Sequence, residues 1–302
     1  MLELYKNIEN CNPDSSNMVL TALEGDFFGE KALVSDGQLV WESKEDGFFS
    51  CHREELKQEF KSNLVEIGGT KLFCDNLGHE AHLVICGGGH VAIPVIQIGV
   101  MMGCEVTVLE DRPQFANNAR KAGATHVICE PFEEGLDKVP GNQDTFFVIV
   151  TRGHRYDQVC LEKIAKKKHA YIGMIGSRLR VRTVKEALLE RGTDQDVLDG
   201  IYSPIGLNIG SETPAEIAVA IMAEIIEVKN KKKRTHGYSK ELMRGILDEQ
   251  ACPEKKVLIT IVTRQGSAPQ GVGAKMLVMP DGKTIGTIGG GCMESDVLQE
   301  LF

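Results

Sequence analysis

The sequence lacks an excess of positive charge, a long hydrophobic run and any closely spaced pair of cysteines. Its 34 lysines and arginines are outnumbered by 43 acidic residues, which gives a formal net charge of −9. A chain with this balance has no overall field that attracts a polyanion. We therefore expect no nucleic-acid partner.

The longest uncharged apolar stretch, residues 91–103, is well short of the roughly 20 residues that a membrane-spanning helix needs. The opening residues MLELYKNIEN contain an early acidic residue and no apolar segment typical of a signal peptide. We therefore expect no membrane partner. The nine cysteines are odd in number and include no Cys-x-x-Cys pair, which argues against a disulfide framework and a structural zinc site. Reduced thiols indicate a cytoplasmic location.

Glycine, in contrast, is abundant: 32 of the 302 residues, about one in ten, against a usual share of roughly 7%. The length favours two domains of about 150 residues each. Many of the glycines fall in a few short loops, and these loops lie between expected strands and helices.

The two ends of the chain resemble each other. Residues 18–40 parallel residues 257–285, and residues 50–60 fall beside residues 291–302. Each copy is typical of a strand, a loop, a strand, a turn at Asp-Gly, a strand and a short helix. The aligned pairs include Lys31 with Lys275, Leu33 with Leu277 and Cys51 with Cys292. The pattern favours an internal duplication over chance similarity, with the later copy retaining more glycines.

Between the copies, strands and helices alternate, which predicts a parallel sheet with crossover helices. A capping box at residues 213–216 begins a long helix that we expect to run through Ile226. The basic run at residues 229–234 is interpreted as a linker, with an anion-binding segment as the alternative. Other expected strands are residues 82–87, 104–111, 125–129, 144–151 and 170–175.

The predicted fold class is α/β: a Rossmann-like doubly wound parallel sheet flanked by a small α+β module made from the N- and C-terminal segments. The expected domains are residues 1–80, a degenerate copy of the module; 81–230, the Rossmann-like domain; 231–255, a linker and helix; and 256–302, the module with intact glycine-rich loops.

A dinucleotide-binding fingerprint directly follows the first strand of this central domain. Residues 87–92, GGGHVA, fit the pattern GxGxx(G/A), and the next strand ends in Glu110-Asp111 about twenty residues later. Glycines let the backbone approach a pyrophosphate, and an acid can accept a hydrogen bond from a ribose hydroxyl. Asp111 is the candidate acid. Arg112 beside it can instead meet a 2′-phosphate, so both NAD and NADP stay open.

Polar motifs also follow two later strands, at the edge of the sheet where ligands bind. Residues 151–157 contain Arg152 and His154, and residues 173–178 contain Gly176, Ser177 and Arg178. The second motif opens a helix and predicts an additional anion site. The histidine can act as an acid or base near neutral pH, or simply bond to the backbone.

The C-terminal copy has two glycine-rich loops. One contains Ser267, and the other runs from Gly289 to Gly291 directly before a helix, a geometry that accommodates anions. Cys292 follows at the helix start, where the dipole favours a thiolate that can ligate a soft metal. The alternative is a small buried residue. Glu294 is interpreted as a helix-capping residue.

Together these segments resemble the XdhC/CoxI family, the accessory proteins of xanthine dehydrogenase and related molybdenum hydroxylases. The segments are ICGGGHVAIP, EDRPQFAN, VTRGHRYD, YIGMIGSR, SPIGLNIGSETPAEIAVAIMAEI, GSAPQGVGAKMLV and TIGGGCMES, which cover most of residues 82–228 and 257–296. In this sequence the intact glycine-rich segment follows the Rossmann-like domain instead of preceding it. The intact loops then come either from the same chain or from a dimer partner.

The resemblance implies that the protein binds the molybdenum cofactor (molybdopterin), protects it during sulfuration and delivers it to a hydroxylase such as xanthine dehydrogenase. It implies a maturation chaperone rather than a catalyst, so no catalytic residues are assigned. Implied partners are the hydroxylase, a cysteine desulfurase and a second copy in a homodimer. The candidate cofactor-binding residues are Gly87, Gly88, Gly89, His90, Asp111, Arg112, Arg152, His154, Gly176, Ser177, Arg178, Ser267, Gly289, Gly290, Gly291 and Cys292, with Cys292 also the candidate molybdenum ligand.

Two other functions are weighed beside this one. The fingerprint also fits an NAD(P)-dependent oxidoreductase that uses His154 or Arg152 toward its substrate, and another nucleotide is a further candidate ligand. Against an oxidoreductase, the sequence offers no recognisable group of substrate-binding residues, and a fold alone does not establish a function. The third hypothesis is a regulatory relative that has lost cargo binding.

Overall fold

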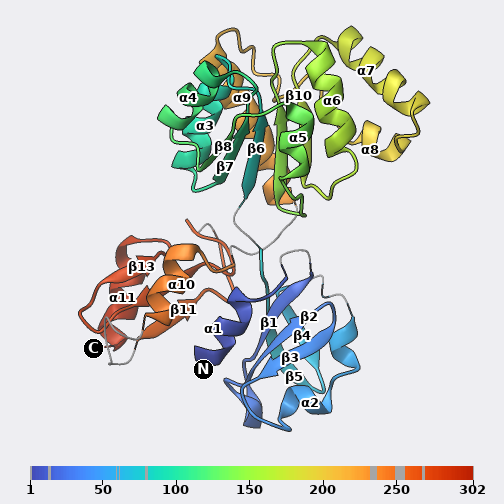
Figure 1. The fold of residues 1–302 in the computed structure, drawn as a ribbon. Helices are drawn as coiled ribbons and strands as arrows, with labels where there is room; N and C mark the ends of the chain where they lie inside the picture. The colour runs from blue at the N-terminus through green and yellow to red at the C-terminus, as the bar shows by residue number, and fades with distance from the viewer. Residues whose placement is uncertain are drawn as a thin grey trace. The chain divides into compact units, whose positions relative to one another are not determined.

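The computed structural model describes residues 2–12, 15–58, 60, 62–78, 81–231, 237–248, 256–266 and 269–301, with the backbone alone at residues 292 and 301. The chain forms two compact units (Figure 1). Unit 1 combines Met1–His79 with Arg234–Phe302, and unit 2 is Glu80–Lys233. No helix in the described part of the chain is both long enough and apolar enough to cross a bilayer.

Unit 2 contains a five-stranded parallel sheet in the order β10-β9-β6-β7-β8. Strand β6 lies at the centre, and the chain proceeds outward from it first on one side and then on the other. This is the order of a doubly wound fold, so the predicted fold class is confirmed. The strands are β6 (His82–Cys86), β7 (Glu105–Leu109), β8 (His126–Ile128), β9 (Thr145–Ile149) and β10 (Tyr171–Met174).

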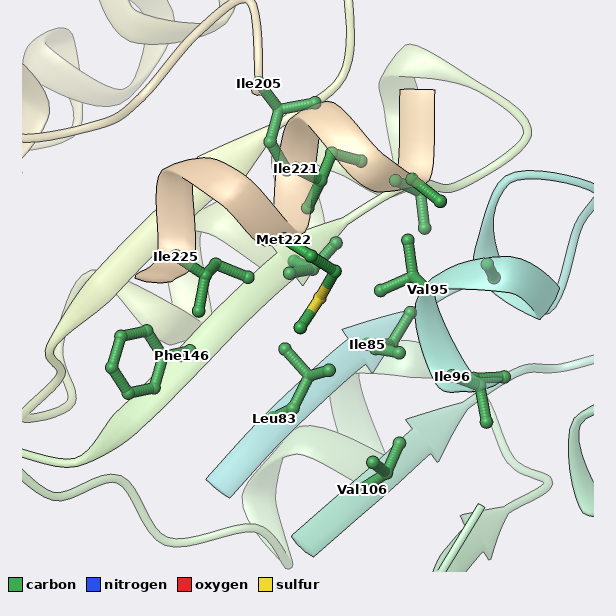
Figure 2. Packing of buried hydrophobic residues seen from close by; sticks show 14 of the residues in the cluster. Leu83, Ile85, Val95, Ile96, Val106, Phe146, Ile205, Ile221, Met222 and Ile225 are labelled. Atoms are coloured by element: carbon green, nitrogen blue, oxygen red, sulfur yellow. The ribbon is translucent and has the colours of Figure 1, made fainter. Parts of the chain in front are cut away.

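Helices cover both faces of this sheet. Alternate residues of β6 point in opposite directions, so Leu83 and Ile85 belong to one buried cluster and Val84 belongs to the other. Figure 2 shows the first cluster, in which Ile221 and Met222 of α9 pack toward β6. The helices of this unit are α3 (Ala92–Met101), α4 (Pro113–Lys121), α5 (Phe132–Asp137), α6 (His154–Ile164), α7 (Arg178–Glu190), α8 (Gln195–Asp199) and α9 (Pro214–Lys231).

The start of α9 is as predicted, but its end is not. The Glu216 carboxylate accepts a hydrogen bond from the Thr213 N–H at 3.0 Å, and the Thr213 hydroxyl accepts one from the Glu216 N–H at 3.3 Å. This is the expected capping box. The prediction of a linker from residue 229 is wrong for its first part, because the helix continues to Lys231, which pairs with Glu227 one turn earlier at 2.6 Å. Residues 232–236 lie outside the described residues.

Unit 1 begins with a five-stranded antiparallel sheet in the order β3-β2-β1-β5-β4. Its strands are β1 (Asn17–Ala22), β2 (Lys31–Ser35), β3 (Gln38–Glu42), β4 (Leu64–Ile67) and β5 (Thr70–Asn76). The helical elements of this segment are α1 (Leu2–Glu9), α2 (Phe48–Cys51) and the 3-10 turns η1 (Gly25–Phe27) and η2 (Glu55–Lys57).

The C-terminal segment of unit 1 contains α10 (Lys240–Leu247), β11 (Val257–Thr260), β12 (Lys275–Val278), β13 (Thr284–Gly286) and α11 (Gly291–Leu301). Its sheet has the order β11-β12-β13. Thr21 lies opposite Lys31 in the first sheet, and Thr260 lies opposite Lys275 in the second. The two copies therefore share strand register as well as sequence. Each is also preceded by a helix, α1 or α10, which the sequence comparison did not include.

One hydrophobic cluster joins the two sheets of unit 1. It contains Leu33 and Leu277, the aligned leucines of the two copies, together with residues of α1 and α10 such as Leu4 and Ile246. A buried ion pair also connects the sheets: the Lys275 ammonium lies 2.7 Å from the Asp75 carboxylate, and both side chains are no more than 3% exposed.

The Asp75 pair predicts a large loss of stability on mutation. Asp75→Asn leaves the Lys275 ammonium buried without its counterion, so we expect the free energy of unfolding of unit 1 to fall by about 3–5 kcal/mol. The only tryptophan of the chain, Trp41, lies in β3, so its fluorescence measures the unfolding of unit 1 in urea.

Asp281→Asn is the matched control, because Asp281 pairs with Lys283 at the surface, where removing an ion pair has little effect. Equal unfolding midpoints for the two variants would contradict a structural role for the Asp75 pair.

Candidate functional site

The fingerprint loop connects β6 to α3, and its glycines have different roles. Gly87 has φ +115°, and a Cβ there would lie 2.6 Å from the Val150 carbonyl oxygen, so the packing of the strand ends requires glycine. A Cβ on Gly89 would meet nothing within 4 Å. Gly89 therefore presents open backbone at the N-terminus of α3, where the helix dipole favours an anion. His90, the next residue, is exposed.

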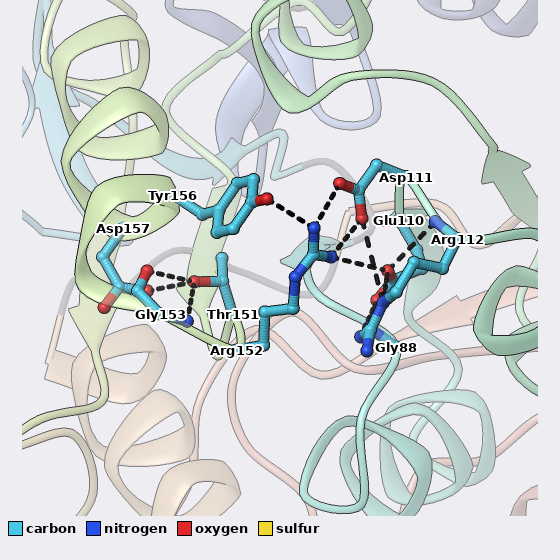
Figure 3. A network of polar contacts seen from close by, with 9 residues as sticks. All are labelled: Gly88, Glu110, Asp111, Arg112, Thr151, Arg152, Gly153, Tyr156 and Asp157. Carbon is cyan, nitrogen blue, oxygen red and sulfur yellow. Dashed lines mark hydrogen bonds and ion pairs between the residues drawn. The ribbon is translucent and has the colours of Figure 1, made fainter.

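Glu110 holds this loop from beneath (Figure 3). Its side chain is fully buried at the end of β7, and its carboxylate accepts a hydrogen bond from the Gly88 N–H at 2.7 Å. Arg112 donates to the same carboxylate from Nε at 2.7 Å and from Nη2 at 3.1 Å. Arg112, the alternative candidate for contact with a 2′-phosphate, is thus paired with the acid beneath the loop.

Asp111 and Arg152 form a second pair at the same edge of the sheet. The Arg152 guanidinium donates to both carboxylate oxygens, at 2.5 and 2.8 Å, and also to the Tyr156 hydroxyl (Figure 3). The hydrogen bond from Arg152 is the main cause that lowers the pKa of Asp111 below its usual range. A ribose hydroxyl that bonds to Asp111 must therefore compete with Arg152.

Asp157 connects the next two helices. It is fully buried, accepts a hydrogen bond from the Thr151 hydroxyl and pairs with Arg180. Burial is the main cause that raises the pKa of Asp157. The contact fixes the start of α6 against the first turn of α7. His154, the first residue of α6, stays exposed.

The residues of the predicted second anion site have two different roles in the structure: Ser177 caps a helix, and Arg178 lines a separate cavity. The Ser177 hydroxyl accepts a hydrogen bond from the Arg180 N–H at 3.4 Å, which makes it the N-cap of α7. Gly176 precedes it with φ +154°. Arg178 lines a separate cavity of about 350 Å³ with Arg182 and other residues of α7 and α8. This cavity carries more positive than negative side chains.

In unit 1, the loop at residues 289–291 is filled by a carboxylate of the chain itself. Glu294 of α11 accepts hydrogen bonds from the N–H groups of Ile288 and Gly290, each at 3.0 Å, and from the Thr287 hydroxyl at 2.5 Å. The Thr287 hydroxyl is the main cause that lowers the pKa of Glu294. The expected anion-accommodating geometry is present, and here the anion is Glu294. Ser267 and the Cys292 side chain lie outside the described residues.

The structure thus brings Gly88, Asp111, Arg112 and Arg152 together at one edge of unit 2. Sequence reasoning did not assign Glu110, Tyr156 or Arg180 a role. Glu110 had a signal: it is the first residue after a strand of buried residues, directly beneath the glycine loop. The described residues contain no group of three or more His, Cys, Asp or Glu side chains that could hold a metal ion.

The fold and the loop define unit 2 as a Rossmann-type domain, and comparison with known families agrees. Residues 83–225 match the XdhC Rossmann domain, and residues 251–302 match the XdhC and CoxI family. The two matches together cover more than half of the chain, which belongs to the XdhC and CoxI family.

Two curated proteins are similar to part of the chain. YqeB of Escherichia coli (strain K12), described as uncharacterized, is 29% identical over 164 residues, which are 54% of this chain and 30% of YqeB. A protein of Bacillus subtilis (strain 168), described as a probable subunit of xanthine dehydrogenase, is 26% identical over 162 residues, 54% of this chain and 47% of the relative. The matched region thus spans less than half the length of either relative.

Among solved structures, the chain resembles one described as a xanthine dehydrogenase from Bacillus halodurans. The TM-score is 0.59 at 22% sequence identity, over 78% of this chain and 67% of the other. At this identity the likeness supports the fold.

The Asp111 pair predicts a shifted titration on mutation. Arg152→Gln removes the main cause of the lowered pKa, so we expect the pKa of Asp111 to rise toward its usual value, measured by ¹³C NMR titration of the side-chain carboxyl. Arg155→Gln is the control, because Arg155 is an exposed arginine in the first turn of α6, three residues after Arg152. An Asp111 pKa that is the same in both variants would show that the pair does not form in solution.

Proposed function

We propose that this chain binds the molybdenum cofactor, protects it during sulfuration and delivers it to a molybdenum hydroxylase of the xanthine dehydrogenase type. Membership of the XdhC and CoxI family supports an accessory role. So does the similarity to a protein described as a probable subunit of xanthine dehydrogenase. The cofactor is then cargo, and the chain acts as a maturation chaperone rather than as a catalyst.

The open backbone of Gly89 carries this proposal. It lies at the N-terminus of α3, where the helix dipole and the free N–H groups of the first turn favour the phosphate of molybdopterin. His90 is exposed beside it. Arg152 lies at the same edge. It can release Asp111 and bind an anionic ligand instead, which breaks one exposed ion pair. Such exchange suits a carrier, because the same acid can displace the cargo again.

The C-terminal loop is a second candidate contact for the cofactor, and it lies within unit 1. The backbone at residues 289–291 can contact the cofactor only where Glu294 leaves an N–H accessible or moves away. Cys292 is placed at the start of α11, and we assign its thiolate as the ligand of molybdenum in the bound cargo. Partners in this role are the hydroxylase, a cysteine desulfurase that supplies sulfur, and a second copy of the chain in a homodimer.

Co-purification tests the proposal. Protein isolated under argon from a molybdenum-competent host should retain pterin and molybdenum, measured by mass spectrometry. We expect Gly89→Ala to reduce retention about tenfold, because its Cβ would stand in the space offered to the phosphate while meeting no protein atom. Cys292→Ala should reduce the retained molybdenum.

Gly200→Ala is the matched control, since its Cβ would make only ordinary contact, 3.4 Å from the Asp196 carbonyl oxygen, at the end of α8. Equal retention of pterin by the Gly89→Ala and Gly200→Ala variants would overturn the placement of the phosphate, and wild-type protein without pterin or molybdenum would overturn the proposed function.

The second candidate function is an NAD(P)-dependent oxidoreductase, favoured by the complete fingerprint loop and the acid beneath it. Calorimetry with NAD, NADH, NADP and NADPH separates the two. Because Asp111 and Arg112 are both engaged in ion pairs, we expect no binding of any of the four at millimolar concentration. Submillimolar binding of one of them would favour the oxidoreductase instead.

A further inference from the structure

The two sheets of unit 1 differ at one edge. In the first copy, β1 pairs with β2 on one side and with β5 on the other. In the second copy, β11 is the equivalent of β1, since Thr21 and Thr260 lie opposite the aligned lysines of β2 and β12. Among the described residues, β11 pairs with β12 alone, and no strand takes the place of β5. One edge of β11 is therefore unpaired in this part of the chain.

The backbone groups on this edge follow from the hydrogen-bond pattern. Ile261, just after β11, donates from its N–H to the Ala274 carbonyl oxygen at 3.0 Å, on the β12 side. Successive residues of an antiparallel strand direct their backbone groups to opposite sides, so those of Leu258 and Thr260 point away from β12. The equivalent residues of β1 face β5. Unpaired N–H and C=O groups in such a row are a template for another strand.

The side chains of β11 are also less covered than those of β1. Leu20 of β1 is fully buried in a cluster that includes Leu72 and Cys74 of β5. Its equivalent, Ile259, is only half-buried. All four residues of β11 are half-buried, whereas five of the six residues of β1 are buried. A strand added at the open edge would bury this apolar surface, as β5 does in the first copy.

The same difference leaves one charge of unit 1 without a counterion. Lys275 of β12 pairs with Asp75 of β5. Lys31, the equivalent residue of β2, donates to the Thr21 hydroxyl at 2.8 Å and forms no ion pair with any described residue. Burial is the main cause that lowers the pKa of Lys31. The acid equivalent to Asp75 would lie on a strand paired with β11.

The first copy also indicates where on the added strand this acid lies. Asp75 is opposite Val19 in the antiparallel pairing of β5 with β1. Leu258 is the equivalent of Val19, so the acid belongs opposite Leu258. Equivalent faces of the two sheets meet in one hydrophobic cluster, so this acid faces Lys31 as Asp75 faces Lys275.

A second copy of the chain cannot supply β5 for this purpose without opening its own sheet. Its β5 lies between β1 and β4 and is hydrogen-bonded on both sides. The observations therefore favour a segment of a different protein over a second copy.

We propose that the open edge of β11 binds an extended segment of a partner protein in which an acidic residue follows apolar ones. The segment pairs antiparallel with β11, its apolar side chains cover Ile259, and its carboxylate meets Lys31. In strand addition of this kind, main-chain hydrogen bonds give affinity and side chains give specificity. The edge belongs to unit 1, so the proposal does not rest on cofactor binding by the Rossmann domain.

A matched pair of peptides tests the edge. The first has the sequence of residues 69–78, GTKLFCDNLG, which contains β5, and the second differs only by Asp75→Asn. We expect the first to bind the full ¹⁵N-labelled chain about tenfold more tightly, because only its carboxylate can pair with the Lys31 ammonium. Binding is followed by ¹H–¹⁵N NMR titration in a reducing buffer. The largest shifts are expected at the amides of Leu258 and Thr260.

Lys31→Gln should remove the difference between the two peptides, because the charge that selects the acid is gone. Lys57→Gln is the control and should keep the tenfold difference, since Lys57 is an exposed lysine of unit 1 that pairs with Glu54.

Equal affinities of the two peptides for the unchanged chain would overturn the role of Lys31. No shift of the β11 amides at millimolar peptide, or shifts confined to β1, would overturn the docking edge. A dimer in which the Leu258 and Thr260 amides are already protected from hydrogen exchange would overturn the partner segment in favour of a second copy. None of these results depends on retention of pterin, so this inference and the proposed function can fail separately.

Discussion

A carboxylate that leaves water must be neutralised, and both units are organised around this constraint. Glu110, Asp157 and Asp75 are almost completely buried, and each lies close to a cation from another part of the chain. These cations are Arg152, at 3.7 Å from Glu110, Arg180 for Asp157 and Lys275 for Asp75. Losing one partner would leave a buried charge without compensation, a loss of several kcal/mol. These pairs therefore fix which loops and sheets lie against one another.

In unit 2, the same constraint shapes the site. Glu110 engages Arg112 and the Gly88 N–H, and Asp111 engages Arg152, so most of the positive charge at the sheet edge is matched within the protein. The backbone at Gly89, in contrast, has open space beside it. In unit 1 the glycine loop before α11 is likewise matched by Glu294. Each glycine-rich loop thus donates a backbone N–H to an internal carboxylate, Glu110 or Glu294.

The fold and the fingerprint could be predicted from the sequence because their signals are local. Buried strands of five residues, a capping box at Thr213 and a glycine loop between strand and helix are each decided by neighbouring residues. The ion pairs could not be predicted in this way, because Asp111 and Arg152 are 41 residues apart and meet only when β7 and β9 lie in the same sheet. The same holds for a cavity in unit 1 lined by Ile8 of α1 and Met243 of α10, which forms only when these two helices lie together.

The end of α9 is a local feature that the sequence predicted wrongly. A run of lysines suggested a linker, but the helix continues. Val228 stays buried, the lysines extend into water, and Lys231 pairs with Glu227 one turn earlier. The shared register of β1 with β2 and of β11 with β12, in contrast, follows from the aligned residues Lys31 and Lys275, since pairing of one copy predicts pairing of the other.

The proposed binding of the molybdenum cofactor at the Gly89 loop is tested most directly by amide shifts. The full chain, labelled with ¹⁵N, is titrated under argon with molybdenum cofactor released from a purified molybdoenzyme, and the ¹H–¹⁵N spectrum is followed. Phosphate binding at the start of α3 predicts the largest shifts at the amides of Gly89 and His90. Shifts confined to residues 289–291, with Gly89 unchanged, would contradict it.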